Sequence, residues 1–221
     1  MFPDHLIIDF DSTFITKESL DELANTALRN HPEKAHRLDQ IKELTRAGME
    51  GEITFDESLS QRMKLLDASR NDVNEVTQIL SKEVTPSIER NKNFIRKNAD
   101  QILIISGGFR EMIIPIVAKY GIPSDQVFAN EFIYDSNDRV KQVDSQNVMT
   151  QSGGKVTQVI ALGLSGEIHV MGDGYTDYQL KSEGPATHFY AFVENVRREN
   201  VCKVADDVLS DFDEYVKIVV D

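Results

Sequence analysis

The stretch His5-Leu6-Ile7-Ile8-Asp9-Phe10-Asp11-Ser12-Thr13 places two aspartates at the end of a short apolar run. A run of this kind is typical of a buried β-strand. A second acidic pair, Asp173 and Asp177, follows another apolar run far down the chain. Carboxylates at the ends of buried strands repel one another and are costly to desolvate, so a protein that gathers four of them needs a cation. Oxygen ligands suit Mg²⁺, which usually shares its coordination shell with a substrate phosphate, and the pattern therefore indicates metal-assisted phosphoryl chemistry.

Apolar runs and helical patterns alternate over most of the chain. Alternation of this kind predicts a parallel sheet whose strands are joined by right-handed helical crossovers. After the strand at residues 5–10, the expected elements are a helix over about 86–98, a strand at Ile102–Ile105, a helix with Met112 and Val117, a strand ending near Asn130, a helix at about 153–164, strands at Ile168–Met171 and Phe189–Phe192, and a helix at about 206–220.

The segment between about residues 16 and 82 interrupts this alternation directly after the first strand. It is polar, and its apolar residues recur at helical spacing in three groups, which begin at Leu20, Leu38 and Phe55. We expect a helical cap domain at residues 15–84, inserted into an α/β core made of residues 1–14 and 85–221. A small β-hairpin is expected at residues 132–140. The predicted fold class is α/β, with a Rossmann-like parallel-sheet core, an inserted small helical cap and a small β-hairpin.

The composition narrows the function classes. The 221 residues carry 37 Asp and Glu against 24 Lys and Arg, a net charge of −13. This balance argues against nucleic acid and anionic membranes as partners. No apolar run is long enough to span a bilayer, and the N-terminus does not read as a signal peptide. The single cysteine, Cys202, cannot form an internal disulfide, so we expect a cytoplasmic protein. We expect it to be a monomer or a homodimer.

Four polar clusters follow predicted strands: Asp9 with Asp11, Ser106 with Gly107, the region leading to Lys155, and Asp173 with Asp177. In open α/β sheets, ligands bind beyond the carboxyl ends of the strands. Each cluster alone has an ordinary structural interpretation, because Asp, Ser and Gly all form turns and a lone lysine is usually solvated. Their joint occurrence at strand ends on one alternating framework favours a single active site.

These residues resemble the motifs of the haloacid-dehalogenase superfamily of phosphatases. Asp9-Phe10-Asp11-Ser12-Thr13 is similar to the first motif, and Ser106, Lys155 and Gly172-Asp173-Gly174-x-Thr176-Asp177 are similar to the second, third and fourth. The resemblance covers essentially the whole chain. It is closest to the phosphoserine phosphatases, as judged by Glu18-Ser19, Met49-Glu50-Gly51, Phe55, Ser58-Leu59 with Arg62, Ser106-Gly107-Gly108-Phe109 and Phe128-Ala129-Asn130.

The resemblance implies hydrolysis of O-phospho-L-serine, a step of serine biosynthesis, through an aspartyl-phosphate intermediate. Asp9 would attack phosphorus, since carboxylates are nucleophiles in other phosphoryl-transfer enzymes. Asp11 would protonate the leaving oxygen and then activate water. Lys155 would neutralise the nucleophile and the transferring group. Mg²⁺ would be held by Asp9, Asp11 (through its carbonyl), Asp173 and Asp177.

The same resemblance implies how the substrate is bound. Ser106, the Gly107 amide and the Thr176 hydroxyl would contact the phosphate. Arg62 can grip a carboxylate through two parallel hydrogen bonds, and Glu18 can pair with an ammonium group. The predicted substrate-binding residues are Glu18, Met49, Phe55, Arg62 and Gly108. Taken without the family, Met49 and Phe55 read as core residues, Arg62 as an ion-pair partner and Glu18 as a first-turn acid.

Three places depart from the phosphoserine phosphatase pattern. Tyr175 and Thr176 stand where Ala and Asn are common, Phe14 replaces a more usual aliphatic residue, and Gln151–Gly154 before Lys155 is unusual. A different small phosphomonoester, or phosphotransfer to an acceptor alcohol, therefore stays open as an alternative function. A second alternative is a signalling domain phosphorylated on Asp9, against which the long helical insertion argues. A third is a binding protein without activity, although every chemical position is filled.

Overall fold

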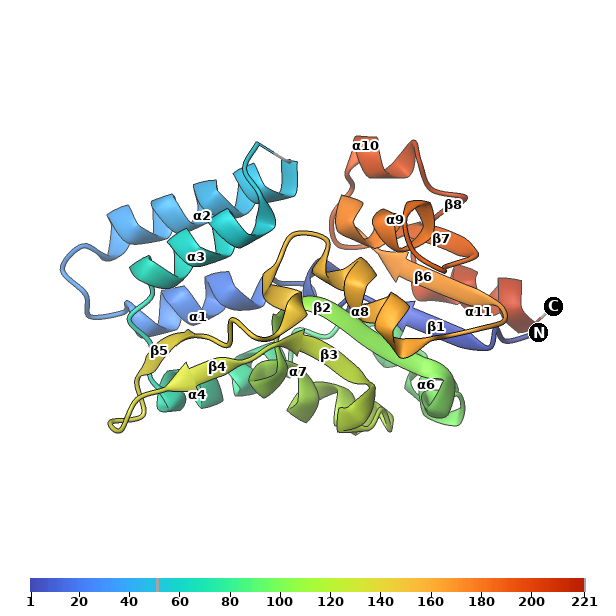
Figure 1. Cartoon of the computed structure of the whole chain (residues 1–221). Helices are drawn as coiled ribbons and strands as arrows, with labels where there is room; N and C mark the ends of the chain where they lie inside the picture. The colour runs from blue at the N-terminus through green and yellow to red at the C-terminus, as the bar shows by residue number, and fades with distance from the viewer. Residues whose placement is uncertain (51, 221) are drawn as a thin grey trace.

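The computed structural model describes residues 1–50 and 52–220, except for the side chains of residues 49 and 50. A six-stranded sheet forms the centre of the protein, in the order β3-β2-β1-β6-β7-β8, and every neighbouring pair of strands is parallel (Figure 1). The strands are β1 (His5–Ile8), β2 (Ile102–Phe109), β3 (Val127–Asn130), β6 (Ile168–Gly172), β7 (His188–Phe192) and β8 (Asp207–Leu209). The predicted α/β fold with a Rossmann-like parallel sheet is confirmed.

The sheet is covered on both faces, which explains its nearly continuous apolar strands. Leu6 and Ile8 of β1 pack into a core that includes Met112 and Ile116 from helix α7 (Arg110–Val117). Ile7, which points the other way, belongs to a second core that includes Val159 and Leu180. The α-helices that follow residue 85 are α5 (Pro86–Arg90), α6 (Lys92–Lys97), α7, α8 (Gly154–Leu162), α9 (Tyr175–Ser182), α10 (Glu199–Cys202) and α11 (Phe212–Val220).

The prediction of one C-terminal helix over about 206–220 is wrong for its first third. Residues 207–209 form β8, whose Val208 is paired with Ala191 of β7, and α11 begins only at Phe212. Pairing with the open edge of a sheet is a long-range effect that outweighs local propensity. The helix predicted over 86–98 is also divided, because the chain leaves helical geometry at Asn91 between α5 and α6.

Strand β2 is longer than predicted and runs through Ser106, Gly107 and Gly108 to Phe109. The register against β3 shifts between Ile105 and Phe109, so this segment is extended but irregular. Asn130 at the end of β3 donates a hydrogen bond from Nδ2 to the Gly107 carbonyl at 2.8 Å. The serine and glycines expected in a turn are therefore held on the last residues of a strand.

The stretch predicted as the cap folds into four helices, α1 (Ser19–Ala27), α2 (Lys34–Glu50), α3 (Phe55–Leu65) and α4 (Arg70–Leu80). Helices α2 and α3 pack together, and α4 packs against both α1 and α7. In Figure 1, α2 and α3 lie over the carboxyl ends of β1 and β2, while α4 lies beside α7. The division of the chain at residues 14 and 84 stays a prediction, because α4 packs both on α1 of the expected cap and on α7 beside the sheet.

The small hairpin is confirmed. Strands β4 (Phe132–Tyr134) and β5 (Val140–Val143) form a separate antiparallel pair. Val140 donates its amide hydrogen to the Ala68 carbonyl at 2.9 Å, and Arg70 donates its amide hydrogen to the Asp138 carbonyl at 2.8 Å. The hairpin thus anchors the link between α3 and α4. Across residues 1–50 and 52–220, every helix falls short of the length and apolar character needed to cross a membrane.

Candidate active site

The predicted site residues meet at the carboxyl edge of three adjacent strands. Asp9 follows the central strand β1, Ser106 and Gly107 end β2 on one side, and Asp173 follows β6 on the other. A cavity of about 660 Å³ lies between this edge and the helices α2 and α3. Twelve of the predicted residues line it: Asp9, Asp11, Glu18, Phe55, Arg62, Ser106, Gly107, Gly108, Lys155, Asp173, Thr176 and Asp177. Met49 lies in the last turn of α2, and its side chain is outside the described part of the structure.

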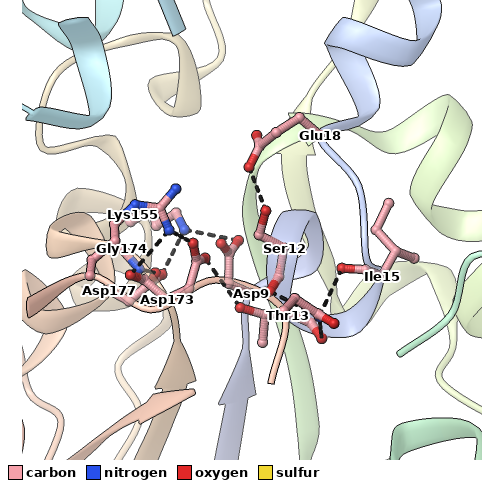
Figure 2. Close-up of polar contacts among 11 residues, drawn as sticks. Asp9, Ser12, Thr13, Ile15, Glu18, Lys155, Asp173, Gly174 and Asp177 are labelled. Carbon is pink, nitrogen blue, oxygen red and sulfur yellow. Dashed lines mark hydrogen bonds and ion pairs between the residues drawn. The ribbon is translucent and has the colours of Figure 1, made fainter. Parts of the chain in front are cut away.

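Lys155 is the buried cation at the centre of the site (Figure 2). Its Nζ lies 3.0 Å from Asp9 Oδ1 and 2.7 Å from Asp177 Oδ1. Burial alone would lower the pKa of Lys155, but the adjacent Asp177 and Asp9 carboxylates raise it above its usual value. The lysine is therefore charged at neutral pH and is held by the first turn of α8, beside the carboxylate expected to attack phosphorus.

Asp9, Asp173 and Asp177 form an acidic cluster in which one oxygen of each lies within 4.8 Å of the others. Asp173 is ion-paired with Arg198 and accepts a hydrogen bond from Thr13 Oγ1 at 3.3 Å. Arg198 was not predicted from the sequence. It lies in the loop after β7, at no spacing that relates it to the acidic motifs, so only the folded chain reveals its position.

The acidic cluster fits a divalent cation. The buried oxygens Asp9 Oδ1 and Asp173 Oδ2 accept no hydrogen bond from any described residue, although Lys155 and Arg198 respectively face them. Burial and the Asp9 charge raise the pKa of Asp177 to about 6, despite the opposing effect of Lys155. Three carboxylates against two cations leave a surplus of negative charge, and carboxylate oxygens are the ligands that Mg²⁺ prefers.

We expect Mg²⁺ to stabilise the folded protein through this cluster. A ligand present at 100 times its Kd stabilises by about 2.7 kcal/mol, which corresponds to a rise in Tm of roughly 5–10 °C for a chain of this size. Thermal unfolding with chelator and then with excess Mg²⁺ measures this rise. Asp173→Asn should lose most of it, whereas Asp125→Asn, a remote exposed acid, should keep it. An equal rise in wild type and Asp173→Asn would place the ion elsewhere.

The turn after β1 directs Asp11 away from the acidic cluster and toward the cap. Ser12 adopts a left-handed conformation with φ of 55°, and its Oγ donates to Glu18 Oε1 at 2.6 Å. The Asp11 carboxylate accepts hydrogen bonds from the Ser19 amide at 3.0 Å and from Ser19 Oγ at 2.9 Å. Burial, followed by the charges of Glu18 and Asp9, raises the pKa of Asp11 well above its usual value. A carboxyl group that keeps its proton is suited to act as a general acid.

Asn195 holds this turn from the opposite side. Its Nδ2 donates to the Ser12 carbonyl at 3.1 Å and to Thr85 Oγ1 at 2.7 Å, and Thr85 Oγ1 in turn donates to the Thr13 carbonyl at 2.7 Å. These contacts join the loop after β7 to the two ends of the helical insertion. Neither Asn195 nor Thr85 was predicted from the sequence, because they contact each other and main-chain carbonyls that lie far away in the chain.

The end of β2 offers backbone amides and a hydroxyl to the cavity. Ser106 Oγ accepts a hydrogen bond from the Gly108 amide at 3.0 Å. A Cβ at Gly107 would lie 3.0 Å from Cε2 of Phe55, so the phenyl ring packs directly on this glycine. A Cβ at Gly108 would lie 3.2 Å from Asp11 Oδ2. Any larger residue at Gly107 or Gly108 would therefore intrude on the cavity.

Arg62 brings a cation to the cap side of the cavity. Its Nη1 donates to Thr45 Oγ1 at 3.3 Å, and Thr45 Oγ1 donates to Asp21 Oδ1 at 3.1 Å. Its Nε is buried without a hydrogen-bond partner among the described residues, and burial lowers the pKa of Arg62 from its usual value. A buried guanidinium with an unused donor is a site for an anionic group of a ligand. Thr45 and Asp21, which position Arg62, were not predicted.

Comparison with known proteins identifies the family to which the chain is similar. The family model described as haloacid dehalogenase-like hydrolase matches residues 6–181. The phosphoserine phosphatase of Bos taurus is 33% identical over 214 residues, which cover 95% of this chain and 90% of the relative, and that of Homo sapiens is 32% identical over the same coverage.

A solved structure gives the same relationship. A phosphoserine phosphohydrolase-like protein from Francisella tularensis subsp. tularensis SCHU S4 superposes with a TM-score of 0.85 at 32% identity, and the match covers 97% of this chain and 99% of that one. A substrate-bound phosphoserine phosphatase complex superposes with a TM-score of 0.76 at 24% identity, which supports the fold.

Proposed function

The chain belongs to the haloacid dehalogenase-like hydrolase family, and we propose that it hydrolyses O-phospho-L-serine to L-serine and phosphate. One observation carries this proposal beyond the family. One cavity is lined by Lys155, Ser106 and the acidic cluster, and also by Arg62 and Glu18. The first group suits a phosphate with its metal ion, and the second suits the carboxylate and ammonium groups of an amino acid.

The first half-reaction transfers the phosphoryl group to the protein. The Asp9 carboxylate attacks phosphorus, while Lys155, 3.0 Å from Asp9 Oδ1, offsets the negative charge that gathers between nucleophile and phosphate. Ser106 Oγ and the Gly107 amide bind the phosphate oxygens. Asp11, whose pKa is raised by burial, gives a proton to the serine oxygen as that oxygen leaves.

The second half-reaction releases phosphate. Asp11, now a carboxylate between Ser19 and the cavity, accepts a proton from a water molecule that attacks the aspartyl-phosphate. Asp9 leaves as a free carboxylate and Asp11 regains its proton, so both return to their starting forms. Phe55 on Gly107 covers the reacting groups and limits the access of other water.

Mg²⁺ is the proposed cofactor, held by Asp9, the Asp11 carbonyl, Asp173 and Asp177. When bound, it supplies positive charge to the phosphate oxygens and to the carboxylates around them. Arg198 would exchange its ion pair with Asp173 for other contacts, because the same carboxylate is a proposed ligand. We also propose a cytoplasmic location, in line with the single cysteine, and a monomer or homodimer.

Arg62 provides the test of the substrate. If it binds the serine carboxylate, Arg62→Ala should lower kcat/KM for phosphoserine about ten- to hundredfold, the size expected for a charge-assisted hydrogen bond of about 1.5–3 kcal/mol. Hydrolysis of phosphoethanolamine, which lacks the carboxylate, should change little in the same variant. Arg62→Lys should recover only part of the loss, because an ammonium cannot reproduce the planar fork.

Two outcomes would change this assignment. An equal loss on both substrates would place Arg62 on the phosphate or in the packing of the cap, and the phosphoserine proposal would fail while phosphatase activity remained. Transfer of phosphate to an added alcohol, in preference to water, would identify a phosphotransferase. Quantifying free phosphate and phosphorylated acceptor in one reaction separates hydrolysis from transfer.

A further inference from the structure

Helices α2 and α3, here called the cap helices, form one unit over the cavity. Ser58 Oγ of α3 donates to the Leu44 carbonyl of α2 at 2.8 Å. A Cβ at Gly48 would lie only 2.9 Å from Ser58 Oγ, so the two helices approach each other closely at this point. A restraint on the first turn of α3 therefore acts on both cap helices.

The cap helices are joined to the rest of the protein through α1, where Thr45 of α2 donates to Asp21 Oδ1 at 3.1 Å, and through the residues that follow α3. Residues 67–70, which follow α3, are fixed to the β4–β5 hairpin by the hydrogen bonds of Ala68 and Arg70 and by the ion pair between Arg139 and Asp67. This anchored end is the natural hinge, because α4 beyond it packs on the core helix α7. The opposite end of the cap helices, at the start of α3, lies over the mouth of the cavity.

A hydrogen bond joins the first turn of α3 to the loop before α8. Ser152 Oγ donates to Asp56 Oδ1 at 2.7 Å. This hydrogen bond connects the cap helices to the loop that leads to Lys155, where α3 also lies against residues 148–150. The Ser152 and Thr54 hydroxyl groups hold the pKa of the Asp56 carboxyl below its usual value, so the acceptor is charged at neutral pH.

The loop that presents Ser152 is conformationally restricted. Gly153 has φ of 72°, a left-handed conformation that favours glycine, and the Gly154 amide donates to the Gln151 carbonyl at 2.9 Å. A Cβ at Gly154 would lie 2.3 Å from the Val148 carbonyl oxygen, which excludes any side chain there. The unusual sequence Gln151–Gly154 thus builds a tight turn that fixes Ser152 three residues before Lys155.

We propose that Ser152 and Asp56 are positioning residues whose hydrogen bond, here called the latch, holds the cap helices closed over the cavity. The latch keeps Phe55 packed on Gly107 and keeps the loop before Lys155 in contact with α3. Entry of substrate and release of product require this hydrogen bond to break, whereas chemistry requires it to form. The kinetic part of this inference rests on the proposed function. The conformational part concerns the cap helices alone and can be tested without any substrate.

A double-mutant cycle tests the latch. Ser152→Ala and Asp56→Ala should each lower kcat/KM for phosphoserine about two- to fivefold, the range for an exposed charged contact, and the double variant should be no worse than either single variant. Where Asp56→Ala also affects the start of α3, the double variant should match Asp56→Ala, because that effect occurs in both backgrounds and cancels in the cycle. Ser152→Thr keeps the hydroxyl and should restore the wild-type value, and Ser60→Ala, exposed on the same helix, serves as the control.

Amide hydrogen exchange tests the latch without any measurement of activity. In substrate-free protein, each single variant should raise amide exchange in residues 55–60 and 148–156 together, with exchange in the β-sheet unchanged. Additive losses in the double variant, or unchanged exchange at both segments, would overturn the latch. A chain that fails to hydrolyse phosphoserine but shows the paired rise in exchange would refute the proposed substrate and retain the latch.

Discussion

Asp9→Asn is expected to abolish turnover. The variant keeps the shape of the side chain at the end of β1 but removes the charge that makes it a nucleophile. Loss of the nucleophile in an enzyme with a covalent intermediate costs on the order of 10⁶-fold in kcat. Lys155 would still pair with Asp177 at 2.7 Å, and relief of repulsion in the acidic cluster offsets the lost contact with Asp9. We therefore expect the folded state to survive, with a Tm close to that of wild type.

Rapid quenching with radiolabelled substrate distinguishes this role from a purely structural one. Wild type should carry acid-stable label on the peptide that contains Asp9, and Asp9→Asn should carry none. Asp125→Asn, which changes an exposed acid remote from the cavity, controls for the change in net charge. Label on a different residue, or measurable turnover by Asp9→Asn, would show that Asp9 does not attack phosphorus.

The parts of the site that follow strands were predictable because two local facts suffice for them. Asp9 and Asp173 come directly after apolar runs, and parallel strands place their carboxyl ends at one edge. The proposed identity of Lys155 as the central cation depended on family resemblance, since a lone lysine has no pattern of its own. In the folded chain Lys155 is buried between the Asp9 and Asp177 carboxylates, which is a contact that its position in the sequence does not reveal.

The parts that were missed depend on contacts between distant residues. Arg198 reaches Asp173, Asn195 reaches the Ser12 carbonyl, and Thr45 reaches Arg62, all through side chains at no characteristic spacing. The error at the C-terminus has the same origin, because Val208 becomes a strand residue only by pairing with Ala191 at the sheet edge. A sequence pattern shows hydrophobic periodicity and the residues that end helices and strands. It does not show which distant residues come into contact in the folded chain.

Asp11→Asn is the second large effect that we expect, and it divides the reaction into its two halves. Asparagine can still accept a hydrogen bond from the Ser19 amide through Oδ1, and its Nδ2 can donate to Ser19 Oγ in place of the second bond, so the turn should be preserved. It can neither donate the proton to the leaving oxygen nor take one from water, and such acid–base steps contribute about 10²–10⁴-fold each. Steady-state hydrolysis of phosphoserine should fall by at least this factor.

Varying the leaving group of the substrate and the pH tests whether Asp11 is the residue that transfers the proton. An aryl phosphate needs no protonation to leave, so Asp11→Asn should still form the aspartyl-phosphate from it in a burst, and the intermediate should persist because water is no longer activated. Burial raises the pKa of Asp11, so in wild type the protonated form extends to higher pH and is lost as the pH rises through that pKa. The alkaline decline of kcat/KM for phosphoserine should follow this loss and should be missing in the variant. A burst that vanishes with the aryl substrate as well would mean that Asp11 supports attack by Asp9, and the proton would then have to come from Glu18 or from solvent.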